Sequence, residues 1–147
     1  MQKILAIDPG VKISGWALFE EAELIEIGRT STKATDRILA AVEQNEQLPV
    51  ADNLIIEKPV VYPFERQKGD QNDLIDLAIV VGYFSSFYEF VRLVTPRQWK
   101  GRTPKDISNR RILEACPEAE KMLESIPQGQ QNHAIDAIGI GIWYLKN

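Results

Sequence analysis

Cysteine and histidine are almost absent from this sequence of 147 residues. Its single cysteine, Cys116, has no partner for an internal disulfide, so we expect a reducing, cytoplasmic setting. One cysteine and one histidine, His133, also argue against a zinc site built from these residue types. The chain must therefore be stabilised by an ordinary hydrophobic core, which a sequence of this length can form.

Long apolar runs are also missing. The longest useful run, over residues 77–84, is far shorter than the roughly 20 residues that cross a bilayer. Asp8 stands where the apolar part of a signal peptide would continue, so we expect neither a signal peptide nor a membrane partner. Hydrophobic residues at 44% and charged residues at 26% are typical of globular proteins. Without repeats or Gly/Ser linkers, residues 1–147 are expected to form one domain.

The chain has no excess of positive charge. Lys and Arg number 17 against 21 Asp and Glu, which gives a net charge of −4. The charge of the whole chain therefore does not indicate a polyanionic partner. Residues 92–111, however, carry seven Lys and Arg against a single acid, Asp106. A local basic segment of this kind is either a solvated helix face or a surface that binds phosphates, and charge alone favours neither.

Hydrophobic patterns and turn residues predict strands that alternate with helices. The expected strands cover residues 3–8, 14–20, 23–28, 53–57 and 92–95. The expected helices cover residues 36–46, 70–87, 104–115 and 132–145. This order predicts an α/β fold with a mixed five-stranded sheet, helices on both faces, and the first, fourth and fifth strands parallel.

Three carboxylates stand in apolar surroundings. Asp8 and Glu57 end the first and fourth strands, and Asp136 lies in a helix among alanines and isoleucines. Each alone has an ordinary explanation as a turn former, an ion-pair partner or a solvated helix residue. Neighbouring parallel strands, however, end at the same edge of a sheet, where ligand sites form, so Asp8 and Glu57 are expected to meet there. Their repulsion calls for a cation, and carboxylate oxygens suit Mg²⁺ or Mn²⁺.

His133 precedes Asp136 by one helical turn, so both side chains project from one face of the last helix. A single helical histidine is usually a capping or surface residue. Here Gly139 and Gly141 follow it, and glycine inside a helix costs about 1 kcal/mol relative to alanine. The two glycines predict close packing of this helix on the sheet, which would bring His133 and Asp136 against Asp8.

Three short motifs contain these residues. They are Ile-Asp8-Pro-Gly10 with Gly15-Trp-Ala, Ile-Ile-Glu57-Lys-Pro, and His133-Ala-Ile-Asp136-Ala-Ile-Gly. They occur in this order over nearly the whole chain, and through them the sequence resembles the RuvC family of Holliday junction resolvases. That family belongs to the ribonuclease H-like nucleases, and the sequence is most similar to its compact phage members.

The resemblance implies a metal-dependent, structure-selective endonuclease that resolves four-way DNA junctions by paired symmetric nicks, in the cytoplasm of a bacterial cell or a phage-infected host. It implies that Asp8, Glu57, His133 and Asp136 are the catalytic, metal-holding positions. Two Mg²⁺ ions per site, for which Mn²⁺ would substitute, could then clamp the attacking and leaving oxygens of a phosphodiester and leave 5′-phosphate and 3′-hydroxyl ends. Many family members have an acid in place of His133, which leaves open whether His133 ligates metal or activates water.

DNA-binding residues are expected in two segments that leave the same edge of the sheet, after Glu57 and after the fifth strand. Their basic residues are Lys58, Arg66, Lys68, Arg97, Lys100, Arg102 and Lys105. Tyr62 and Phe64 either stack on or wedge between opened bases, or fold back onto the core. Trp99 has the same two alternatives, and we expect it to pack.

The helix over residues 70–87 is the expected dimer contact, as the resemblance implies, and residues 77–84 are apolar nearly all round. A buried helix of a monomer would show the same pattern. Other functions compete with the homodimeric resolvase: an RNA-processing nuclease of the YqgF kind would share the fold, and a non-catalytic branched-DNA-binding module would use only the basic segment. An actin-like ATPase would need a second domain to close over its nucleotide.

Overall fold

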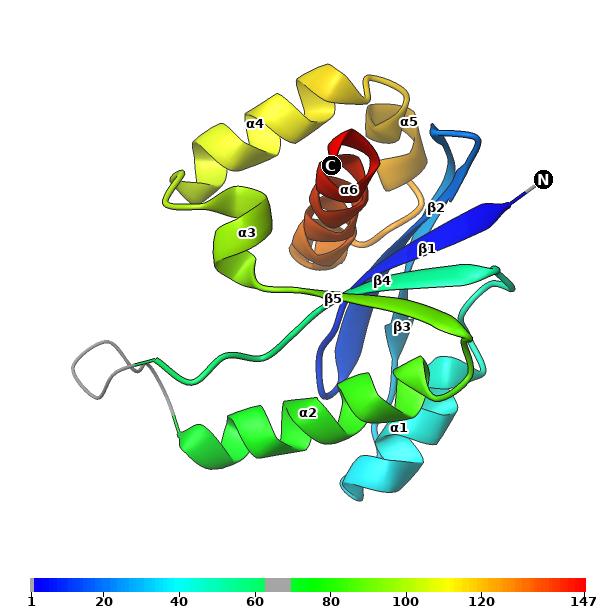
Figure 1. Ribbon diagram of the computed structural model, residues 1–147, viewed down its shortest axis with the longest axis vertical. Helices are drawn as coiled ribbons and strands as arrows, with labels where there is room; N and C mark the ends of the chain where they lie inside the picture. Colours follow the sequence, from blue (N-terminus) through cyan, green and yellow to red (C-terminus); the bar gives the residue numbers. More distant parts are fainter. Residues whose placement is uncertain (1, 63–69) are drawn as a thin grey trace.

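The computed structural model describes residues 2–62 and 70–147 (Figure 1). Its five strands form one sheet in the order β3-β2-β1-β4-β5. The strands are β1 (Lys3–Asp8), β2 (Ile13–Glu20), β3 (Glu23–Ser31), β4 (Asn53–Glu57) and β5 (Phe90–Val94). Neighbours β1, β4 and β5 run parallel, whereas β2 is antiparallel to both β1 and β3. The expected mixed five-stranded sheet is therefore confirmed, including its three parallel strands.

Helices cover both faces of this sheet, as expected (Figure 1). On one face lie α1 (Arg37–Asn45) and α2 (Gln71–Ser85). The other face carries α3 (Pro96–Lys100), α4 (Lys105–Ala115), α5 (Ala119–Leu123) and α6 (Gln131–Lys146). The short helices α3 and α5, and a 3₁₀ turn at Gln128–Gln130, were not expected from the sequence. Elements of about one turn are too short to show an apolar period, so pattern reading misses them.

The central strand β1 is buried on both sides. Leu5 and Ile7 belong to the apolar cluster beneath α1 and α2, together with Val80 and Phe84 of α2. Ala6 belongs to the opposite cluster, which α6 covers with residues such as Ile138. Because each face of β1 meets a helical layer, the strand reads as an unbroken apolar run rather than an alternating one.

The strand register places the ends of β1, β4 and β5 together. Ile7 of β1 pairs with Ile56 of β4, and Glu57 of β4 pairs with Val94 of β5. Asp8 and Glu57 each follow these paired isoleucines, so the two acids end neighbouring strands at the same edge. Within the described residues, no helix is long and apolar enough to cross a membrane.

Candidate active site

A polar site begins where β1 and β4 end. Asp8 and Glu57 are the last residues of these neighbouring parallel strands, and the Asp8 side chain is 16% exposed. The strands deliver both carboxylates to the edge of the sheet at which ligand sites form in open α/β folds. The site is therefore placed by strand register and not by a flexible loop.

The start of α6 lies directly against the sheet beside Asp8. Gly15 of β2 is the register partner of Asp8, and a Cβ atom on Gly15 would lie 2.0 Å from the carbonyl carbon of His133. Only a residue without a side chain lets the α6 backbone approach so closely. The helix therefore brings His133, and Asp136 one turn later, to the end of β1.

The two glycines of α6 have different roles. A Cβ atom on Gly141 would lie 2.1 Å from the ring of Phe19 in β2, so this glycine gives the close helix–sheet packing that the sequence predicts. Gly139 instead faces α3 and α4, since its Cβ atom would lie 2.7 Å from both Trp99 and Ile112. The expectation that Gly139 packs on the sheet is therefore wrong, because α6 is covered by helices on its outer side.

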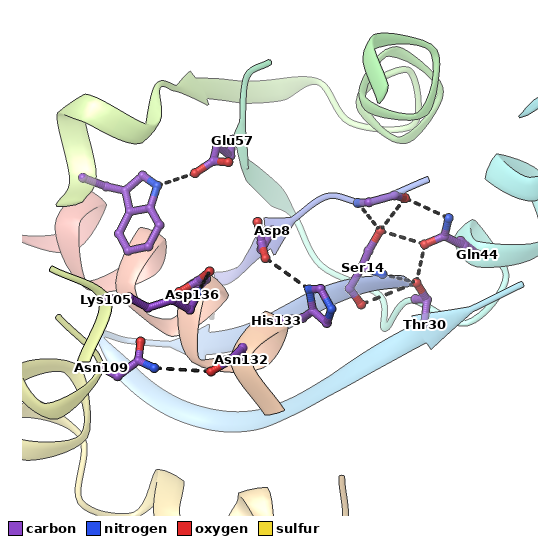
Figure 2. A network of polar contacts seen from close by, with 12 residues as sticks. Asp8, Ser14, Thr30, Gln44, Glu57, Lys105, Asn109, Asn132, His133 and Asp136 are labelled. Carbon is purple, nitrogen blue, oxygen red and sulfur yellow. Dashed lines mark hydrogen bonds and ion pairs between the residues drawn. The ribbon is translucent and has the colours of Figure 1, made fainter. Parts of the chain in front are cut away.

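We call Asp8, Glu57, His133 and Asp136 the charged cluster (Figure 2). His133 Nδ1 lies 3.6 Å from Asp8 Oδ2, and Lys105 Nζ lies 3.1 Å from Asp136 Oδ2. The indole Nε1–H of Trp99 donates to Glu57 Oε2 over 2.5 Å. Each carboxylate thus has a donor or cation of the protein beside it.

Burial and neighbouring charges shift the pKa values of Asp8, Glu57 and His133. Burial raises the pKa of Asp8 above its ordinary value, and the Asp136 carboxylate raises it further. Burial also raises the pKa of Glu57 to about 7, with the neighbouring Asp8 adding to the effect and the Trp99 bond opposing it. The interaction with Asp8 raises the pKa of His133. A further cation beside Asp8 and Glu57 would stabilise their ionised forms.

The donor chemistry of the charged cluster fits a divalent metal ion. Three carboxylates supply hard oxygen ligands, and a cation among them would relieve the repulsion that raises the pKa values of Asp8 and Glu57. Over residues 2–62 and 70–147, however, no three His, Cys, Asp or Glu side chains lie close enough together to hold a metal ion. The residues are thus brought to one place without adopting the geometry of a metal site, and their carboxylates would have to turn to converge on an ion.

A second polar group adjoins the turn that follows Asp8, and we call Ser14, Thr30 and Gln44 the neutral cluster (Figure 2). All three side chains are fully buried. Gln44 Oε1 accepts from Ser14 Oγ at 2.7 Å and from Thr30 Oγ1 at 2.6 Å, while its Nε2 donates to the carbonyl oxygens of Gly10 and Val11 at 3.0 Å. Every hydrogen-bonding position of this amide is filled. The neutral cluster therefore ties α1 to the turn between β1 and β2.

Sequence reasoning missed the contributions of Gln44 and Trp99 to this region. A glutamine in an amphipathic helix is usually solvated, and the sequence carries no signal that Gln44 points inward. Trp99 packs against the core, as expected, but its bond to Glu57 joins residues far apart in the chain. Both contacts depend on the tertiary arrangement of α1 and α3.

Where the structure describes them, the expected DNA-binding residues lie in the segments that follow β4 and β5. Lys58 follows Glu57 directly, and Tyr62 is 40% exposed. Arg97, Lys100 and Arg102 are exposed in and after α3, and Lys100 Nζ lies 5.3 Å from the centre of the Trp99 ring. Lys105 is paired with Asp136 instead of projecting alone. Phe64, Arg66 and Lys68 lie outside the described residues.

No protein-family model and no curated protein matches this sequence. Among solved structures, the chain is similar to T. thermophilus RuvC in complex with Holliday junction substrate, at 14% identity and a TM-score of 0.58, over 99% of this chain and 96% of that chain. It is also similar to a Thermus thermophilus RuvC structure, at 15% identity and a TM-score of 0.54, over 98% of this chain and 95% of that chain. At these identities the similarity shows a shared fold, and the expected ribonuclease H-like architecture is confirmed.

Proposed function

We propose that this protein is a divalent-metal-dependent endonuclease that cuts four-way DNA junctions. The observation that carries the proposal is the charged cluster, in which Asp8, Glu57, His133 and Asp136 come from three distant parts of the chain to one edge of the sheet. The fold shared with RuvC, one of whose structures holds a Holliday junction substrate, supports the choice of DNA substrate.

In this proposal the charged cluster holds two Mg²⁺ ions, for which Mn²⁺ can substitute. Bound ions would supply Lewis-acid stabilisation to the attacking and leaving oxygens of a phosphodiester. Without metal, Lys105 lies beside Asp136 and His133 lies beside Asp8. Once a bound ion takes its place beside Asp8, neutral His133 would either ligate metal or take a proton from an attacking water, and its 40% exposure lets that proton leave to solvent.

DNA would lie across the end of the sheet from which the basic segments emerge. Lys58, Arg97, Lys100 and Arg102 are exposed near this edge and would bind backbone phosphates. Lys105 would join them once a metal ion replaces it beside Asp136. We also assign phosphate binding to Arg66 and Lys68 and base stacking to Tyr62 and Phe64, on their sequence positions after Glu57.

Paired nicks in a junction with two-fold symmetry call for a two-fold dimer. Helix α2 is the proposed contact, because Ile75 is 60% exposed and Ile79 is 36% exposed on it, and Phe87 just beyond it is 58% exposed. Val80 and Phe84, in contrast, are buried against the sheet. One side of α2 therefore presents exposed apolar side chains, and a second copy of the chain could cover them.

The function can be tested by incubating the protein with labelled four-way, Y-shaped and linear duplex DNA and with structured RNA, each with and without Mg²⁺ or Mn²⁺. We expect paired nicks in the four-way junction only when metal is added. Equal cleavage of all branched DNA would indicate a general branch nuclease, and cleavage of RNA alone would indicate the RNA-processing alternative. Junction binding with no cleavage under any condition would indicate a binding module.

A further inference from the structure

Trp99 makes the one side-chain hydrogen bond to Glu57 among the described residues, from its indole Nε1–H to Oε2 at 2.5 Å. Because Glu57 is partly buried, few water molecules are near enough to replace the indole as its hydrogen-bond donor. The indole engages one oxygen of the carboxylate, which anchors Oε2, and a turn of the carboxylate about this bond would bring Oε1 to a ligand.

Three elements hold the Trp99 ring in place. The ring lies against the backbone of α6, where a Cβ atom on Gly139 would approach it to 2.7 Å, and it packs on the core cluster that includes Ile112 of α4. Its own helix, α3, begins with a reciprocal capping box in which Thr95 Oγ1 accepts from the Gln98 N–H and Gln98 Oε1 accepts from the Thr95 N–H. Trp99 is therefore a rigid donor and not a mobile one.

The location of Gly139 links this donor to the rest of the charged cluster. Gly139 lies one helical turn after Asp136 on α6. The Trp99 ring thus rests on the helix that carries Asp136, while its N–H holds Glu57 at the end of β4. This indole therefore connects Glu57 of the sheet to the helix that carries Asp136.

We infer that Trp99 is a positioning residue, whose N–H orients the Glu57 carboxylate so that Glu57 and Asp136 can bind the same metal ion. The inference rests on the proposed function, because it gives Glu57 and Asp136 a shared metal ion to hold. A purely packing role for Trp99 would need its ring but not its N–H. The two roles are separable, because phenylalanine keeps an aromatic ring against Gly139 and beneath Lys100 but has no hydrogen-bond donor.

The test compares Trp99→Phe with Trp143→Phe. Trp99 and Trp143 both line one pocket of about 260 Å³, but Trp143 stacks against Arg92 of β5, which lies 5.5 Å from its ring. Mn²⁺ affinity measured by calorimetry should fall about 10–100-fold in Trp99→Phe, as for other losses of a bond that orients a ligand, and should stay at the wild-type value in Trp143→Phe. Under single turnover, Trp99→Phe should lower the cleavage rate without changing the affinity for the junction.

Wild-type protein provides a second measurement that needs no variant to fold. In ¹H–¹⁵N spectra, the indole N–H resonance of Trp99 should shift during a Mg²⁺ titration, and that of Trp143 should not. Wild-type Mn²⁺ affinity in a folded Trp99→Phe variant, or a Trp99 resonance unaffected by saturating Mg²⁺, would overturn the inference alone. A wild-type protein that neither binds these ions nor cuts DNA would overturn the proposed function as well.

Discussion

The neutral cluster and the charged cluster adjoin the same short segment, residues 8–10, but solve the burial of polar groups in opposite ways (Figure 2). In the neutral cluster, Gln44 fills all of its hydrogen-bonding positions with hydroxyls and carbonyls. In the charged cluster, burial and repulsion raise the pKa values of Asp8 and Glu57. The neutral cluster satisfies the hydrogen-bonding groups of Gln44 by itself, whereas an added cation would stabilise the ionised carboxylates of the charged cluster.

This difference distinguishes a cluster that stabilises the fold from a cluster suited to bind a ligand or take part in a reaction. A satisfied neutral network stabilises the fold and holds the turn after Asp8, because each of its buried groups has replaced its lost water. Buried carboxylates that repel one another reduce stability, and proteins retain such groups mainly where a ligand or a reaction uses them. The two clusters should therefore respond differently to substitution, to pH and to metal ions.

The largest effect is expected from Asp8→Asn, which removes one metal-holding charge. Cleavage of four-way junctions in Mg²⁺ should fall about 10³-fold, since metal stabilisation of the reaction contributes several kcal/mol. Binding of the junction, measured by gel shift, should persist because the basic surface is intact. Asp52→Asn is the matched control, since Asp52 accepts from the Lys3 backbone at the opposite end of the sheet. Equal losses of binding and cleavage would contradict this division of roles.

Gln44→Leu should break the neutral cluster and lower the free energy of unfolding by about 2–4 kcal/mol. The change removes the nearest acceptor of the Ser14 and Thr30 hydroxyls, which keep only longer contacts to the carbonyls of Gly10 and Ser14. It also removes the donor to the Val11 carbonyl, and a buried polar group that loses its partner costs about 1–3 kcal/mol. Denaturant unfolding measures the loss, which should be the same at pH 5 and pH 8 because no member of this cluster titrates there.

The control for this substitution is Gln47→Leu, because Gln47 bonds to Ser31 at an exposed position. Its cost should stay below about 1 kcal/mol, since water can replace the lost partners. If the two variants lose equal stability, burial of the neutral cluster is not what makes it stabilising.

The pH dependence of stability in Glu57→Gln should show how far the charged cluster destabilises the fold. The pKa of Glu57 is raised by burial to about 7 in the folded protein, above its ordinary 4.5, so the folded state binds this proton more tightly than the unfolded state. Its contribution to stability is therefore fully present below about pH 4.5 and is lost as pH rises to about 7. In metal-free buffer, Glu57→Gln should equal the wild type at pH 4.5 and exceed it by about 1–3 kcal/mol at pH 8.

Unfolding curves over this pH range measure the difference, with Glu89→Gln as the control for removing a charge from an exposed position. A Glu57→Gln variant that is less stable than the wild type at pH 8 would mean that the buried carboxylate is not a cost to the fold.

The smallest effect on the fold is expected from the exposed cations, which belong to neither cluster. Lys100→Gln with Arg102→Gln should leave unfolding unchanged but should reduce the slope of log affinity for DNA against log salt by about 2 units, since each phosphate contact contributes about 0.9. Binding measured over a range of salt concentrations tests this. An unchanged slope would show that this segment faces away from DNA.

Several parts of this arrangement could be read from the chain. The apolar runs before Asp8 and Glu57 defined β1 and β4, and apolar residues at helical spacing located α1 and α2, which the structure shows to begin after the capping aspartates Asp36 and Asp70. These features are local, since they depend on periodicity and on turn chemistry within a few residues. The short helix α3 was missed for the same reason, because its capping box covers only one turn and shows no period.

The sequence by itself determined the order of the strands and the longer helices and the presence of carboxylates at strand ends, because both follow from neighbouring residues. Only the tertiary structure decided which groups surround them. Gly15 admits the backbone of His133, Gly139 seats Trp99 against α6, and Gln44 turns inward to the β1–β2 turn. Such contacts join residues that the chain separates widely, and they form only when β-sheet pairing and helix packing have fixed the distance between their backbones.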